Sequence, residues 1–273
     1  MNLMHAMAKT QITRFSLPIY LAVVFLLSWP FQFAYIFLGE SYRPLLLVSM
    51  VMVMVGTYVS GRFLFHDNFA NAGWKTGTLK NYISVLMFAL LIWVAPVLIE
   101  LIFHLNVLPG KFSISSILQV FAGSFFLTLI PAFGEEFGWR GYLFPKLCER
   151  NSLKKALLIH GLITWAWHIP YLLAMSLDMG GILWLTIPMV MIISIVPAVM
   201  HAIIFAYFWD RSGSLAVATV YHSAFDEIRD SLQKGVGFGP IVDPWQMAVI
   251  TLTGGYLLFK GNWKMKTNSD IQS

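Results

Sequence analysis

Ionisable side chains interrupt three otherwise apolar stretches of the chain. Charged groups and imidazoles are costly in such surroundings, so their presence indicates a functional site. The residues are Glu135, Glu136 and Arg140 in the first stretch, His168 in the second, and His222 and Asp226 in the third. Carboxylates and imidazoles together can activate a water molecule for hydrolysis, with or without a metal ion.

The spacing within two of these groups predicts local pairs on helices. Glu136 and Arg140 are four residues apart, so on a helix they share a face and can form an ion pair. Glu135 then points about 100° away without a local partner, which leaves its carboxylate available as a general base. His222 and Asp226 are also four residues apart and present two polar groups on one face.

Glu135, His168 and His222 are predicted to lie at one depth in a membrane. We assume that each helix meets the cytoplasmic surface at its nearest basic residue. Those basic residues lie 11, 13 and 11 positions away, at Lys146, Lys155 and Arg211 respectively. At ~1.5 Å per residue the three groups are roughly 16–20 Å deep, near the middle of the bilayer. Three separate helices would therefore contribute to one polar layer.

Composition identifies the medium around these helices. Of the 273 residues, 58% are hydrophobic and 11% are charged, whereas a soluble domain carries about 25% charged residues. One globular core cannot bury this much apolar surface, so the excess must face lipid. The single cysteine, Cys148, allows no internal disulfide. The net charge of +5 is attributed to Lys and Arg residues that set the topology in the membrane, and no nucleic-acid partner is predicted.

Hydropathy and charge predict about eight transmembrane helices around a central polar cavity. The expected spans are Leu17–Leu38, Pro44–Phe65, Tyr82–His104, Ser113–Phe133, Ala156–Leu177, Ile182–Trp209, Leu215–Leu232 and Pro244–Phe259. Leu215–Leu232 is polar and requires shielding by other helices or by a water-filled cavity. Without it, Lys260, Lys264 and Lys266 would lie outside, against the positive-inside rule.

The predicted organisation is therefore an all-α, multi-pass protein of the cell membrane with both termini in the cytoplasm. No repeat or long linker divides the chain, so residues 1–273 are expected to form one integral membrane domain. The catalytic core is placed at about 115–230, and residues 261–273 form a short polar tail.

Three motifs in this core resemble those of a known family, the CAAX-protease and bacteriocin-processing (CPBP, or Abi) family. Its E-E-x-x-x-R motif is similar to E-E-F-G-W-R, from Glu135 to Arg140. Its second motif resembles W-A-W-H-I-P, which contains His168, and its third resembles H-S-A-F-D, from His222 to Asp226. The three motifs follow one another in the order that the family has.

The resemblance implies an eight-helix intramembrane endopeptidase related to the type II CAAX-prenyl endopeptidase. Glu135 would activate the hydrolytic water, with Glu136 and Arg140 in supporting positions. His168 and His222 would bind the water or a metal and polarise the scissile carbonyl. Asp226 stands where the family often has Asn, a position associated with oxyanion stabilisation.

Several alternatives remain open at this point. The family has been described both as metalloproteases and as glutamate proteases. Zinc is the candidate cofactor, with Glu135, His168, His222 and Asp226 as its available ligands. The substrate is expected to be a peptide or protein that reaches the cavity from the membrane or the cytoplasm, for peptide maturation, CAAX-type processing or bacteriocin self-immunity. The runner-up is a non-catalytic binding or immunity protein on the same scaffold.

Overall fold

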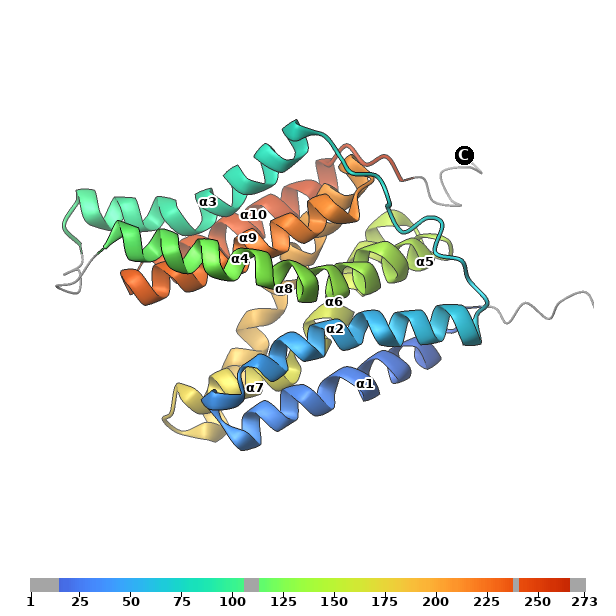
Figure 1. The fold of residues 1–273 in the computed structure, drawn as a ribbon, viewed down its shortest axis with the longest axis horizontal. Helices are drawn as coiled ribbons and strands as arrows, with labels where there is room; N and C mark the ends of the chain where they lie inside the picture. The colour runs from blue at the N-terminus through green and yellow to red at the C-terminus, as the bar shows by residue number, and fades with distance from the viewer. Residues whose placement is uncertain (1–14, 106–112, 238–240, 266–273) are drawn as a thin grey trace, which may run out of the picture.

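The computed structural model describes residues 15–105, 113–237 and 241–265, and this part of the chain contains helices and no β-strand (Figure 1). The α-helices are α1 (Leu17–Leu38), α2 (Pro44–Val59), α3 (Leu79–Ile102), α4 (Ile114–Glu136), α5 (Phe144–Cys148), α6 (Leu153–Trp167), α7 (Ile169–Asp178), α8 (Leu183–Ser212), α9 (Leu215–Gly235) and α10 (Val242–Lys260). The predicted all-α polytopic membrane fold is confirmed.

The number of helices that can cross a membrane differs from the predicted eight. By length and apolarity five segments qualify, and a sixth does if α6 and α7 form one bent span. Helices α9 and α10 form at the predicted places but do not meet this test. Helix α9 packs against α3 and α4, so its polar groups are shielded by other helices as a polar span requires. Lys266, which entered the prediction that the C-terminal end is cytoplasmic, lies outside the described residues.

The first polar cluster lies in an extension of the fourth predicted span. The sequence predicts that this span ends at Phe133, whereas the helical segment runs from Ile114 to Cys148 and is 35 residues long. Its middle, Phe137–Leu143, is a π-helical segment. Such π-helical segments are rare and occur frequently at functional sites. Glu135, Glu136 and Arg140, which follow the predicted end of this span, are buried in the protein interior.

The fifth predicted span is two helices with a break at His168. Helices α6 and α7 are bent by 50° relative to each other. Pro170, near the start of α7, has no amide hydrogen and sterically disfavours a continuous helix through the preceding turn. The backbone N–H of His168 accordingly bonds to Trp165 O at 3.0 Å, which leaves the carbonyl of Thr164 available to a side chain.

Close contact between α2 and the end of α4 joins the two helix groups visible in Figure 1, with α1, α2 and α7 below and α3, α4, α9 and α10 above. A Cβ at Gly134 would come within 3.0 Å of Val51 Cα, and one at Gly138 within 2.4 Å of Val53. Small residues four apart permit such close helix packing in membranes. The two glycines thereby fix the neighbouring Glu135 against the rest of the bundle.

Candidate active site

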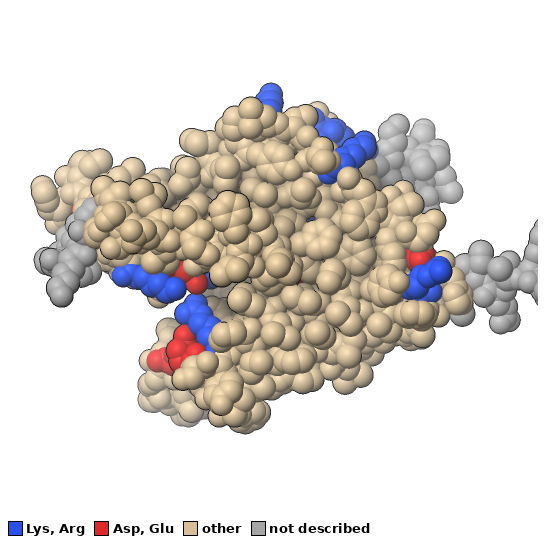
Figure 2. Space-filling view, in the orientation of Figure 1, with Lys and Arg blue, Asp and Glu red and all other residues tan. Residues whose placement is uncertain are grey.

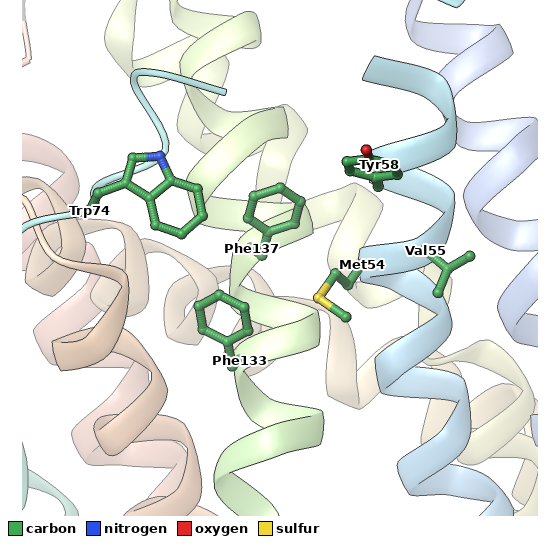
Figure 3. Close-up of a pocket in the computed structure, with 6 residues that line it drawn as sticks. All are labelled: Met54, Val55, Tyr58, Trp74, Phe133 and Phe137. Atoms are coloured by element: carbon green, nitrogen blue, oxygen red, sulfur yellow. The ribbon is translucent and has the colours of Figure 1, made fainter. Parts of the chain in front are cut away.

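The end of α4 separates an apolar face from a polar one. Phe133 and Phe137 line a cavity of about 300 Å³, together with Met54, Val55, Tyr58 and Trp74 (Figure 3). Glu135 and Glu136 lie between these two phenylalanines in the sequence and are buried, with Glu136 fully inaccessible. The cavity beside the predicted site is thus lined by apolar and aromatic side chains, and the ionisable groups are packed together inside the bundle.

Glu136 is the centre of the buried cluster. Its Oε1 accepts a hydrogen bond from Arg140 Nη1 at 2.8 Å, as the four-residue spacing predicts. The same oxygen lies 2.8 Å from His222 Nδ1 on α9, 86 positions along the chain. A carboxylate oxygen accepts from this nitrogen, so His222 Nδ1 carries a hydrogen and its orientation is fixed. The Arg140 guanidinium also lies over the Phe205 ring, 4.1 Å from its centroid.

Glu135 has a local partner, which corrects the prediction that it has none. Its Oε1 accepts a hydrogen bond from Trp139 Nε1 at 3.2 Å, four residues later and within the same helical segment. Its Oε2 lies 3.9 Å from His222 Nε2. This separation exceeds a direct hydrogen bond, so both atoms can still bind a water molecule. The indole fixes one carboxylate oxygen and leaves the other facing His222.

His222 and Asp226 share one face of α9, as predicted. Asp226 Oδ2 lies 3.4 Å from His222 Nε2, and its Oδ1 lies 3.1 Å from Arg229 Nη1. His222 therefore has carboxylate oxygens beside both ring nitrogens, from Glu136 on one side and from Glu135 and Asp226 on the other. The imidazole is the group that links the first and third motifs.

His168 stands apart from this cluster. Its Nδ1 lies 2.7 Å from the carbonyl oxygen of Thr164, which can only accept, so Nδ1 carries the hydrogen and Nε2 stays available. In the described part of the chain, no hydrogen bond or ion pair joins His168 to Glu135 or His222. The ring centroid of its aromatic neighbour Trp167 lies 4.7 Å from that of His168 and 6.0 Å from that of Trp139. Of the three residues predicted at one depth, Glu135 and His222 therefore lie close together. His168 packs against Trp167, which packs in turn against Trp139, the partner of Glu135.

The residues predicted as zinc ligands do not form a metal-binding group. Among the described residues, no three His, Cys, Asp or Glu side chains are placed so that they could hold a metal ion. In the described part of the chain, no hydrogen bond or ion pair joins His168 to the other three candidates, and Asp226 is bound by Arg229. No chemical step below is therefore assigned to a metal.

Two residues of the cluster were missed by sequence reasoning. Trp139 is four positions after Glu135, and Arg229 is three positions after Asp226, so helical spacing could have identified both.

Comparison with known proteins points to the same part of the chain. Residues 117–228 match the family described as Type II CAAX prenyl endopeptidase Rce1-like. A segment of 61 residues is 44% identical to "CAAX prenyl protease 2" of Methanococcus maripaludis. This segment covers 22% of the chain and 21% of that relative. The family match over residues 117–228 contains all three motifs and the buried cluster that the first and third motifs form. The part of the chain that carries this cluster is thus similar to type II CAAX prenyl endopeptidases.

Proposed function

We propose that the chain is an intramembrane endopeptidase that hydrolyses a peptide bond with water activated by Glu135. The observation that carries this proposal is the position of His222, which binds Glu136 through Nδ1 and faces Glu135 through Nε2. A carboxylate oxygen and a ring nitrogen then lie beside one position, which we assign to the hydrolytic water. The similarity of residues 117–228 to type II CAAX prenyl endopeptidases supports peptide-bond cleavage as the reaction.

In the proposed reaction, Glu135 takes a proton from water while the water oxygen attacks the scissile carbonyl carbon. A tetrahedral intermediate forms, with the carbonyl electrons on its oxygen. Its collapse breaks the carbon–nitrogen bond, and the proton held by Glu135 passes to the departing amine. One water molecule is consumed, and one carboxylic acid and one amine are produced. Glu136 and Arg140 hold His222 in place, and His168 Nε2 is assigned to substrate or water.

The proposed substrate is a CAAX-type or other membrane-associated peptide that reaches the cluster from the apolar cavity or from the cytoplasm. Residues on the helix that carries Glu135 also line that cavity (Figure 3), which supports approach of an apolar segment. Incubating purified protein with a farnesylated C-terminal peptide and its unlipidated match tests this. Cleavage of both at equal rates would remove the lipid from the proposed substrate class, and cleavage of neither would contradict CAAX-type processing. Peptide maturation and bacteriocin self-immunity are proposed biological settings.

Replacing Asp226 with asparagine should lower kcat/KM for peptide cleavage by about 10–100-fold, the range seen when residues that orient metal or catalytic ligands are changed. Asp226 lies between Arg229 and His222, and an ionised carboxylate suits both neighbours. Asp243→Asn, on the exposed start of α10, is the matched control and should leave cleavage unchanged. Equal or higher activity of Asp226→Asn would contradict this role. It would instead indicate that position 226 stabilises the oxyanion, because the asparagine amide can donate a hydrogen bond to it.

Removal of metal should leave cleavage intact, because the described residues do not assemble a three-ligand site. The measurement is turnover after exhaustive chelation, with elemental analysis of the same protein sample. Magnesium-treated and zinc-treated aliquots serve as controls for recovery. Loss of turnover on chelation, with recovery on zinc alone and one zinc per chain, would contradict the metal-free reaction and restore zinc as the cofactor.

A further inference from the structure

A series of ion pairs leads away from the catalytic cluster along α9. Arg229 donates from Nη1 to Asp226 Oδ1 at 3.1 Å and from Nε to Asp230 Oδ1 at 2.7 Å. The other oxygen of Asp230 accepts from Arg43 Nη2 at 3.3 Å, and Arg43 also binds Glu40 at 3.2 Å. The charges alternate in sign from Asp226 to the surface.

These ion pairs cross between the two helix groups. Arg43 immediately precedes α2 in the lower group, whereas Asp230 lies on α9, which packs against α3 and α4 in the upper group. Figure 2 shows positive and negative side chains together in the recess between the groups. The side chain of Arg43 is 48% exposed, and those of Asp230 and Arg229 are 18% and 28% exposed. The outer end of the series thus meets water and the inner end meets His222.

Two carboxylates bind Arg229, each at a different nitrogen of its planar guanidinium. Binding at two nitrogens fixes the orientation of the guanidinium as well as the position of its charge. A lysine ammonium supplies the charge without a fixed orientation. Because Asp226 Oδ1 is bound by Arg229, its Oδ2 is left toward His222 Nε2, at 3.4 Å. The orientation of the catalytic imidazole is therefore supported from both sides, by Glu136 at Nδ1 and by Asp226 at Nε2.

We propose that Arg229 is a positioning residue for the reaction, which directs Asp226 toward His222 and is itself held in place by the Asp230–Arg43 pair. This proposal rests on the proposed function and adds to it a residue outside the three motifs. In this proposal Arg229 acts on the reaction through Asp226, which its Nη1 binds. A purely structural arginine would support the fold without a specific effect on turnover.

The test is a double-mutant cycle on kcat with Arg229→Gln, Asp226→Asn and the double variant, using a cleaved peptide and detergent-purified protein. Arg229→Gln should lower kcat by about 10–100-fold. The double variant should be no slower than Asp226→Asn, because the residue through which Arg229 acts is already altered. Fully multiplicative losses would overturn the proposal, as would normal turnover of Arg229→Gln.

Two further variants keep the test decisive if Arg229→Gln folds poorly. Arg229→Lys retains the charge without the planar guanidinium and should still lower kcat, and Arg43→Gln should lower it by about twofold to fivefold, as for a half-exposed ion pair. Arg62→Gln, an exposed arginine on another part of the chain, is the matched control. Wild-type turnover in both Arg229→Lys and Arg43→Gln would overturn the proposal.

Failure of the proposed function gives a different result. A wild-type protein that cleaves no peptide would overturn both the endopeptidase and the role of Arg229. A wild-type protein that cleaves peptides and an Arg229→Gln variant with equal kcat would overturn only the role of Arg229. Thermal unfolding of each variant shows whether a fall in kcat reflects loss of folded protein, and a fall at unchanged Tm supports positioning.

Discussion

Glutamine at position 135 is expected to remove peptide cleavage while the amount of folded protein stays unchanged. Glutamine keeps the shape of Glu135, and its carbonyl oxygen can still accept the hydrogen bond from Trp139. It cannot take a proton from water, so the general base is lost. We expect a fall in kcat of about 10²–10⁴-fold, the usual contribution of such a base.

The measurement is turnover of a cleaved peptide by purified Glu135→Gln, together with its Tm and its yield from the membrane fraction. Glu149→Gln, which changes an exposed carboxylate just beyond the same helical segment, is the control. Turnover of Glu135→Gln close to that of the wild type would contradict the assignment of the base. Equal loss in Glu149→Gln would point to a general effect of altered charge.

Glu136→Gln should lower both stability and turnover. The change leaves the Arg140 guanidinium charged, 4% exposed and without its counter-ion. Removing one partner of a buried ion pair typically costs about 3–5 kcal/mol. His222 also loses the anionic acceptor for Nδ1, so the imidazole is held less firmly beside Glu135. Thermal unfolding in detergent and the peptide-cleavage assay report the two losses separately.

The double variant Glu136→Gln, Arg140→Gln separates the two roles of Glu136. Neutralising both partners removes the uncompensated charge, so Tm should recover much of what Glu136→Gln loses. Turnover should stay low, because His222 still lacks its carboxylate. A single variant as stable as the wild type would contradict a stabilising ion pair, and recovery of turnover in the double variant would contradict the role of Glu136 in holding His222.

Contacts within one helix could be predicted from the sequence. The pairs Glu136–Arg140 and His222–Asp226 follow from four-residue spacing, because that separation returns a side chain to the same helix face. The same rule would have found Trp139 beside Glu135, had its N–H been considered as a donor. Local periodicity is sufficient for these contacts because the helix itself fixes their geometry.

Contacts between helices could be predicted only in part. Counting residues from a basic end gives the depth of a group along a helix but not its position around the bundle. Glu135 and His222 lie close together, and among the described residues no hydrogen bond or ion pair joins either of them to His168, which lies at the break between α6 and α7. The hydrogen bond from His222 to Glu136 depends on how α4 and α9 pack, which no spacing in the sequence encodes.

The most direct test of the central claim is peptide cleavage in water enriched in ¹⁸O. Wild-type protein and Glu135→Gln are reconstituted into lipid nanodiscs and incubated with the farnesylated peptide and with a pool of membrane peptides, and new C-termini are identified by mass spectrometry. The account predicts new carboxylates with one ¹⁸O atom from the wild type and none from Glu135→Gln. No labelled product from the wild type, or the same labelled products from both proteins, would contradict it.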